Sequence, residues 1–227
     1  MSGGARGLEK ISPRGLVIFD LDGTLFQAHT VSIPAVQEVF QSFGLPVPPA
    51  AAILPFFGRP GSEWHPWLRS QCPPERADAL VDAVDRREWE MIAERGRLYP
   101  GVRAALGALR DIAAAMAICS NGPREYVEQV LESRRLTFLF DVVRYRRAGD
   151  TGKPQMVAEL LTLVRARPAV VVGDRWDDIA AAHENGLRAV GAAYGYGPLD
   201  ELAEADALAR EVGELVKIVG EMLGHEV

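Results

Sequence analysis

The chain has 227 residues, of which 48% are hydrophobic and 25% charged, a composition typical of a globular protein with a sizeable core. Its 25 Lys and Arg against 31 Asp and Glu give a net charge of -6, which disfavours nucleic acid or an anionic membrane as partner. Because residues 1–15 lack the apolar core of a signal peptide and no apolar run is long enough to cross a bilayer, we expect a cytoplasmic protein.

Short apolar segments alternate along the chain with amphipathic stretches. The apolar segments are predicted strands at residues 16–19, 114–119, 140–143, 169–172 and 188–192. Between them apolar residues recur at spacings of three and four, as at Val102, Leu106 and Leu109, which is typical of helices that pack on a core. Strands that alternate with helices in this way predict an α/β fold with a parallel sheet.

The connection between the first two predicted strands is much longer than a loop. It runs from about residue 25 to residue 113, whereas loops in such folds usually have about 2 to 6 residues. Apolar spacing within it predicts two helical stretches, separated by an irregular segment at residues 56–67. We therefore expect a small helical cap domain at residues 28–97, inserted into a core formed by residues 1–27 and 98–227.

Two aspartates follow the first predicted strand. Asp20 and Asp22 lie two residues apart on an extended backbone, so their side chains share one side and converge on a small volume. Two carboxylates this close repel each other unless a metal ion or a shared proton is present. Gly23 allows a sharp turn, and Thr24 offers a hydroxyl and an N–H to an anion. Because ligands gather at the carboxyl ends of buried parallel strands, the pattern favours a functional site over a surface turn.

Three later segments also follow predicted strands or precede predicted helices. Ser120 and Asn121 come just before a proline that opens a helix, where hydroxyl, amide and N–H groups bind an anion, although a plain helix cap is an almost equal alternative. Lys153 stands beside a turn and, taken alone, is more typical of a solvated surface side chain. Asp174 and Asp178 belong to an acidic cluster that capping of the next helix explains only in part. Asp174 is the predicted metal ligand.

In this order the segments resemble the motifs of the haloacid dehalogenase superfamily of phosphotransferases. The match consists of Asp20-Leu21-Asp22-Gly23-Thr24, Ser120, Lys153, and Gly173-Asp174 with Asp178, and it spans essentially the whole chain. The insert stands where members such as phosphoglycolate phosphatases, β-phosphoglucomutases and dehalogenases carry a helical C1-type cap. The resemblance therefore implies a Rossmann-like, doubly wound parallel core with a mobile helical cap.

The resemblance also implies a chemistry that suits each residue type. Asp20 would attack phosphorus to form an aspartyl-phosphate, and Asp22 would protonate the departing oxygen and later take a proton from water. Mg²⁺ would bind a carboxylate oxygen of Asp20, the backbone carbonyl of Asp22 and Asp174. Asp178 would orient Lys153 or a metal-bound water. The groups expected to bind the phosphoryl oxygens are Thr24, Ser120, Asn121 with its neighbouring N–H groups, and Lys153.

The presence of Asp22 favours phosphate transfer, because the dehalogenases that the chain resembles lack an acid at that position. We expect hydrolysis of a small organic phosphate monoester, either phosphoglycolate-like or a sugar phosphate, by a monomer or homodimer. Arg59 and His65 in the cap are candidate specificity residues. A phosphomutase of the β-phosphoglucomutase type is the alternative. A phospho-aspartate signalling module is a more distant one, against which the long cap and Asp22 argue.

Overall fold

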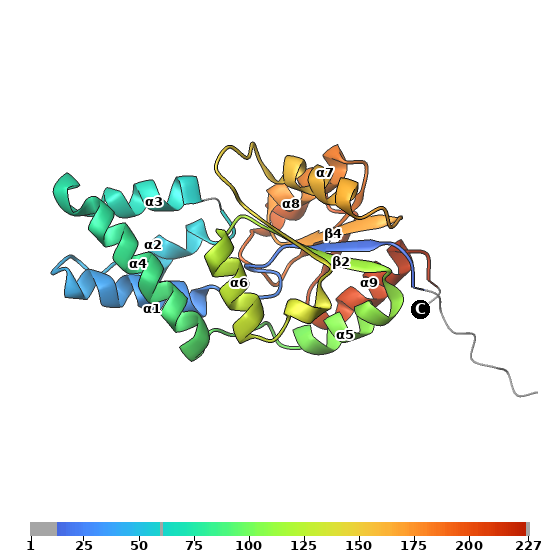
Figure 1. The fold of residues 1–227 in the computed structure, drawn as a ribbon, viewed down its shortest axis with the longest axis horizontal. Helices are drawn as coiled ribbons and strands as arrows, with labels where there is room; N and C mark the ends of the chain where they lie inside the picture. The colour runs from blue at the N-terminus through green and yellow to red at the C-terminus, as the bar shows by residue number, and fades with distance from the viewer. Residues whose placement is uncertain (1–12, 60, 226–227) are drawn as a thin grey trace, which may run out of the picture.

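A single parallel sheet forms the centre of the molecule. The computed structural model describes residues 13–59 and 61–225, so residues 1–12 of the predicted core segment and residues 226–227 lie outside the described residues. Within these residues six strands are arranged in the order β3-β2-β1-β4-β5-β6, all parallel (Figure 1). The strands are β1 (Leu16–Phe19), β2 (Ala115–Ser120), β3 (Val142–Tyr145), β4 (Ala169–Gly173), β5 (Arg188–Ala192) and β6 (Ala207–Ala209).

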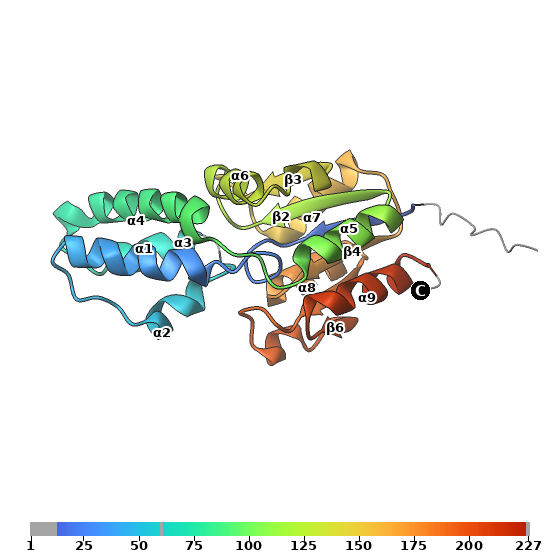
Figure 2. The ribbon, with the colours of Figure 1, turned by 90° about the horizontal axis from the view of Figure 1, so that it is seen from below.

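Helices cover both faces of this sheet (Figure 2). The helices that follow residue 100 in the described chain are α5 (Val102–Ile112), α6 (Arg124–Ser133), α7 (Lys153–Leu163), α8 (Trp176–Glu184) and α9 (Leu215–Met222). The described chain also has short 3-10 helices, which are η1 (Leu54–Phe56), η2 (Thr137–Leu139), η3 (Leu199–Leu202) and η4 (Val212–Glu214). Val17 and Phe19 of β1 belong to one core with α5, α6 and α9, whereas Leu16 and Ile18 belong to a second core with α7 and α8. This alternation confirms the predicted doubly wound α/β fold.

The strand predictions were close for five of the six strands. The third strand begins two residues later than predicted, at Val142, and ends at Tyr145. Strand β6 was not predicted, because its sequence Ala-Leu-Ala has no β-branched or aromatic residue. It pairs with β5 at the edge of the sheet, so its extended form depends on that pairing and not on local preference.

The segment between β1 and α5 is helical. It holds α1 (His29–Ser42), α2 (Ala50–Ile53), α3 (Gly61–Arg69) and α4 (Pro74–Arg95), which gather at the end of the molecule opposite the C-terminus (Figures 1 and 2). The two connections to the core run side by side, since Phe26 pairs with Leu98 in an antiparallel bridge. The domain boundaries placed at residues 28 and 97 stay predictions.

The prediction that residues 56–67 are irregular was wrong for their second half. Helix α3 begins at Gly61 and includes Pro66, which has no N–H and is a poor helix residue at this position. The rings of Trp64 and Trp67 stack at 5.2 Å, and Trp67 also stacks on the buried Phe40 at 6.3 Å. Tertiary packing of these aromatic rings therefore outweighs the local helix preference.

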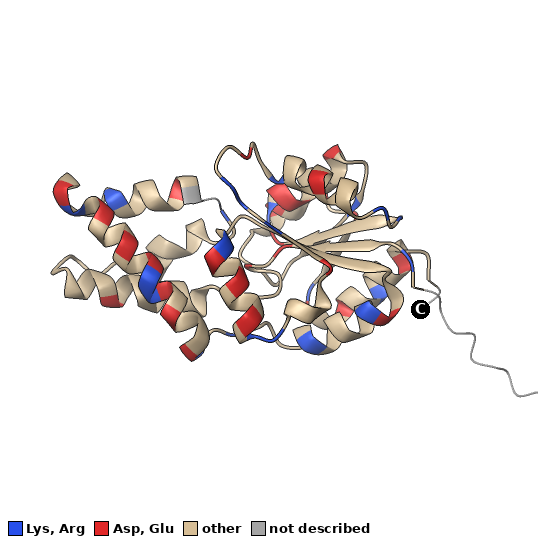
Figure 3. Ribbon diagram, in the orientation of Figure 1, with Lys and Arg blue, Asp and Glu red and all other residues tan. Residues whose placement is uncertain are grey.

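Charged residues occur on the helices and on the connecting loops of the described chain (Figure 3). In the view of Figure 3, Lys and Arg of the described residues are spread over several elements and form no continuous stripe. None of the helices in residues 13–59 and 61–225 combines the length and the apolar character that a membrane crossing requires.

Arg144 of β3 is a buried cation that anchors the loop before α7. Its guanidinium donates to Asp150 at 2.8 and 3.0 Å and to Glu159 at 2.8 Å. The side chains of Arg144 and Asp150 are 4% and 7% exposed. The hydrogen bond from Arg144 lowers the pKa of Asp150 below its ordinary 3.8. This pair fixes the path of the chain into Lys153.

We expect Asp150→Asn to lower stability in a pH-dependent way. Because the folded-state pKa of Asp150 is depressed, its charge stabilises the folded state above the ordinary pKa, and this contribution is lost as the pH falls through the folded-state pKa. The free energy of unfolding should fall by about 2 kcal/mol at about pH 7 and by much less at about pH 2. Urea unfolding at both pH values measures it, and an equal loss at both would contradict the pairing.

Candidate active site

Lys153 lies at the centre of the candidate site. Its Nζ is 2.7 Å from Oδ1 of Asp20 and 2.5 Å from Oδ1 of Asp178, and all three side chains are at most 2% exposed. Burial alone would lower the pKa of Lys153, but the charges of Asp177, Asp178 and Asp20 hold it well above its usual range. The structure thus brings together residues from after β1, the start of α7 and the start of α8.

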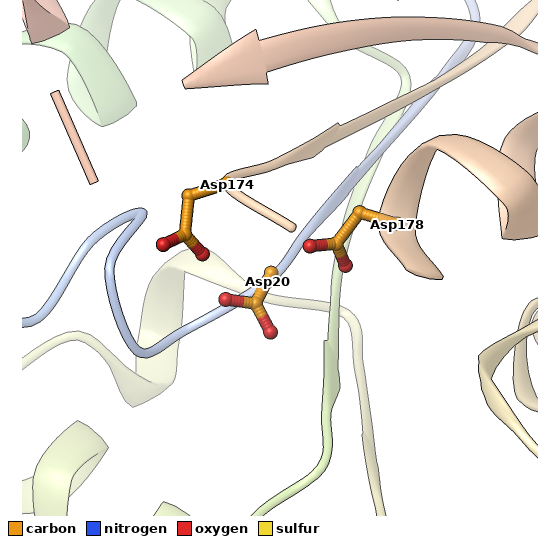
Figure 4. Close-up of side chains that lie close together, drawn as sticks. All are labelled: Asp20, Asp174 and Asp178. Carbon is orange, nitrogen blue, oxygen red and sulfur yellow. The ribbon is translucent and has the colours of Figure 1, made fainter. Parts of the chain in front are cut away.

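Three carboxylates meet at this point. Asp20, Asp174 and Asp178 each offer an oxygen, and these oxygens lie within 4.8 Å of one another. Figure 4 shows the three carboxyl groups close together at this point. They follow β1 and β4, which are neighbours in the sheet, so parallel pairing places their ends side by side.

The negative charge of this cluster exceeds the charge of Lys153. Burial raises the pKa of Asp20 and of Asp174 to about 7, and the neighbouring charge of Asp178 contributes at Asp174. Burial also raises the pKa of Asp178 well above its usual range. One ammonium group cannot neutralise three carboxylates, so the cluster favours the binding of a further cation or of a proton.

Both oxygens of Asp178 already accept a hydrogen bond within the described residues. Its Oδ1 accepts from Lys153, and its Oδ2 accepts from the backbone N–H of Arg175 at 3.1 Å, at the start of α8. A methyl group at Gly173 would collide with this carboxyl, so the glycine permits its position. Asp178 therefore orients Lys153 and caps the helix.

Two other buried oxygens lack partners among the described residues. They are Oδ2 of Asp20 and Oδ1 of Asp174, the side chains that were predicted to bind a metal. The second oxygen of Asp174 accepts from the backbone N–H of Tyr196 at 2.7 Å, which fixes the carboxyl orientation. Unpartnered, anionic, oxygen-only donors fit Mg²⁺, a hard cation. The hydroxyl of Thr24 is a third buried oxygen group without a partner.

Asp22 is held by a residue that sequence analysis did not identify. The hydroxyl of Tyr126, on α6, donates to Oδ1 of Asp22 at 2.7 Å. Burial raises the pKa of Asp22 to about 7, although the Tyr126 hydrogen bond opposes the rise. An acid with such a pKa can carry a proton near neutral pH. The position of Tyr126 six residues after Ser120 was the only available signal, and it is too general to assign a role.

Ser120 and Asn121 lie at the end of β2, facing the same cavity as Asp20. The Ser120 hydroxyl accepts from the backbone N–H of Gly122 at 3.1 Å. The amide group of Asn121 donates to the carbonyl of Gly58 at 2.9 Å and to Asp177 at 2.8 Å. Both side-chain N–H groups of Asn121 are therefore used within the protein, so its backbone N–H is the group left for an anion.

The cavity above these residues extends between the core and the helical insert. It has a volume of about 690 Å³, within the range of about 300–1,000 Å³ that small-molecule sites occupy. Arg59 and His65 both line it, and their role in specificity stays a prediction. Arg59 pairs with Glu63 at 2.9 Å and His65 with Asp85 at 3.3 Å, however, so each basic group already has an acidic partner.

Residues 17–192, which are most of the chain, match the family model of haloacid dehalogenase-like hydrolases. The chain belongs to this family. It is 29% identical over 203 residues to phosphoglycolate phosphatase from Pasteurella multocida, covering 84% of this chain and 90% of the relative. It is 28% identical over 219 residues to the phosphoglycolate phosphatase of Mannheimia succiniciproducens, covering 90% and 97%. The prediction of a phosphatase of this superfamily is confirmed.

Solved structures share the fold of this haloacid dehalogenase-like hydrolase. A crystal structure described as a predicted phosphoglycolate phosphatase from Haemophilus somnus superposes with a TM-score of 0.82 at 22% identity, over 92% of this chain and 99% of that chain. CbbY from Rhodobacter sphaeroides, in complex with phosphate, superposes with a TM-score of 0.74 at 22% identity, over 89% and 96%. These similarities support the same α/β fold.

Gly195→Ala tests whether cation binding depends on the orientation of the Asp174 carboxyl group. A Cβ at Gly195 would collide with the side chain of Asp174 and with the carbonyl of Gly23, although the backbone of Gly195 needs no left-handed conformation. We expect Mg²⁺ affinity to fall by about 10- to 100-fold, as when groups that orient ligands are lost. Calorimetric titration with Mg²⁺ measures this. Gly107→Ala, at a position where a Cβ meets open space, should bind as the wild type does.

Proposed function

We propose that this hydrolase is a Mg²⁺-dependent phosphatase of small organic phosphate monoesters and that it acts through an aspartyl-phosphate. Phosphoglycolate-like esters and sugar phosphates are the candidate substrates, the former because relatives carry that name. The observation that supports the proposal most strongly is a pair of buried oxygens, Oδ2 of Asp20 and Oδ1 of Asp174, which have no partner among the described residues and lie beside the buried ammonium of Lys153.

In the first half of the proposed reaction the carboxylate of Asp20 attacks phosphorus, and the bond from phosphorus to the alcohol oxygen breaks. Asp22, oriented by Tyr126, donates its proton to that oxygen. In the second half a water attacks phosphorus, Asp22 takes its proton, and phosphate leaves Asp20 unmodified. Mg²⁺, held by Asp20, the carbonyl of Asp22 and Asp174, would lower the repulsion between the nucleophile and the phosphate when bound.

The remaining core residues bind the phosphoryl group in this proposal. Lys153 neutralises charge on the phosphoryl oxygens while Asp178 keeps it in place. The hydroxyl groups of Thr24 and Ser120 and the N–H of Asn121 donate hydrogen bonds to the same oxygens. The buried, unpartnered hydroxyl of Thr24 supports this part, because such a group is costly unless a ligand satisfies it.

Asp20→Asn should abolish turnover without loss of the fold. The amide cannot act as the nucleophile, and removing one of three like charges relieves repulsion in the cluster. We expect hydrolysis of p-nitrophenyl phosphate with Mg²⁺ to fall to background, and chelation by EDTA to have the same effect reversibly. Undiminished turnover by Asp20→Asn would exclude the covalent mechanism. Release of free phosphate without a bisphosphate activator separates hydrolysis from the phosphomutase alternative.

Asp22→Asn should affect substrates according to their leaving group. An alkyl phosphate leaves as a strongly basic alkoxide that needs a proton, whereas p-nitrophenolate leaves readily without one. We expect kcat/KM for alkyl phosphates to fall by about 10²- to 10⁴-fold and that for p-nitrophenyl phosphate to fall far less. Steady-state assays of both esters with the same preparation provide the comparison, and equal losses would show that Asp22 is not the general acid.

A further inference from the structure

The cavity contains a carboxylate that neither the motifs nor the proposed mechanism uses. Glu88 of α4 lines the cavity together with Asp20, Asp22 and Ser32, the last of these on α1. The buried hydroxyl of Ser32 donates to Oε1 of Glu88. Neither a hydrogen bond nor an ion pair reaches Oε2 from any residue that the structure describes. One oxygen of Glu88 is therefore held in place, and the other is available to a ligand.

The electrostatic surroundings of Glu88 are acidic. Burial raises the pKa of Glu88 to about 7, and the charge of Asp85 acts in the same direction. The charge of Glu88 in turn contributes to the raised pKa of Asp22. The nearby His65 is paired with Asp85 at 3.3 Å. A partly desolvated carboxylate without a cationic partner is costly, and a ligand that brings a hydrogen-bond donor removes that cost.

The three arginines that line the cavity, Arg59, Arg146 and Arg147, make no bond to Glu88 within the described residues. The guanidinium of Arg147 lies over the ring of Tyr145 at 5.5 Å. Arg59 is engaged by Glu63 at 2.9 Å. Arg146 donates to the amide oxygen of Asn121 at 3.1 Å, next to the end of β2 where the phosphoryl group would bind. Glu88 thus offers an acceptor to the alcohol portion of a substrate, and a carboxylate placed beside it would meet like charge.

We propose that Glu88 determines specificity by accepting a hydrogen bond from a hydroxyl or ammonium group on the alcohol portion of the substrate. The preferred substrates are then phosphate esters of polyols and amino alcohols, and esters of hydroxy acids such as phosphoglycolate are disfavoured. Aromatic side chains of Phe56, Trp64 and Trp89 line the same cavity and suit the C–H faces of a polyol chain or ring. This inference rests on the proposed phosphatase function and narrows its substrate class.

Three esters with the same two-carbon skeleton test the preference. In 2-hydroxyethyl phosphate the group next to Glu88 would be a hydroxyl, in 2-aminoethyl phosphate an ammonium, and in phosphoglycolate a carboxylate. We expect the wild-type enzyme with Mg²⁺ to show kcat/KM for either donor-bearing ester at least about tenfold above that for phosphoglycolate. The ratio between the hydroxyl and ammonium esters distinguishes the two kinds of donor.

Glu88→Gln removes the charge and keeps the shape. The ratio of kcat/KM for 2-aminoethyl phosphate to that for phosphoglycolate should fall by about tenfold or more, because the amide no longer attracts an ammonium and can donate to a carboxylate. Glu90→Gln is the matched control on the same helix, since Glu90 pairs with Arg87 on the exposed face at 3.0 Å. It should keep the wild-type ratio. A purely structural role of Glu88 would change all three esters equally and leave the ratio unchanged.

Binding of the esters to the Asp20→Asn variant, which should not hydrolyse them, separates the phosphatase proposal from the inference about Glu88. The three esters are titrated by calorimetry into Asp20→Asn and into the same protein with Glu88→Gln. If the wild type fails to hydrolyse p-nitrophenyl phosphate but the ester order still depends on Glu88, the phosphatase proposal falls and Glu88 retains its role. Two results would overturn the inference about Glu88 while hydrolysis is observed. The first is that Glu88→Gln leaves the ratios between the esters within about twofold of their original values, both in kcat/KM and in calorimetric affinity. The second is that the wild type prefers phosphoglycolate to the other two esters.

Discussion

The rest of the site depends on two ion pairs. In them the buried ammonium of Lys153 binds the carboxylates of Asp20 and Asp178. A lysine that is 2% exposed is stable in its charged form only if carboxylates compensate the loss of water. Two carboxylates do so here, and the presence of Asp174 beside them leaves the cluster with excess negative charge. The site therefore combines a fixed cation with an excess of negative charge that favours a second cation, which is the charge arrangement that the proposed phosphoryl transfer needs.

The sheet order explains how residues so distant in sequence reach this point. Strand β1 lies at the centre of the sheet between β2 and β4, so Asp20, Ser120 and Asp174 leave adjacent strands at the same edge. Close approach is possible only where side chains are missing. A Cβ at Gly23 or at Gly195 would strike Asp174, and Gly23 also has a positive φ of 91°. Topology and small residues together fix the spacing of the carboxylates.

Sequence alone predicted five of the six strands, and it located the motif residues that follow them, because both depend on local patterns. Buried parallel strands are continuous apolar runs, and the residues of the site follow them directly. What sequence could not predict arises from contacts between distant segments. Helix α3 depends on stacking of Trp67 against Phe40, and β6 depends on pairing with β5. The Tyr126 bond to Asp22 joins residues 104 positions apart, and no local spacing encodes such a contact.

Asn121 and Tyr196 also hold the helical insert against the core. Asn121 donates to the carbonyl of Gly58, and Tyr196, whose N–H fixes Asp174, packs its ring 4.9 Å from that of Phe57. Tyr196 therefore contacts both Asp174 of the core and Phe57 of the insert. A change in the position of the insert would move Glu88 relative to the core and disturb these contacts together. In the proposed function, selection of the alcohol portion by Glu88 and orientation of the reacting groups are therefore physically coupled, because both depend on the same arrangement of insert and core.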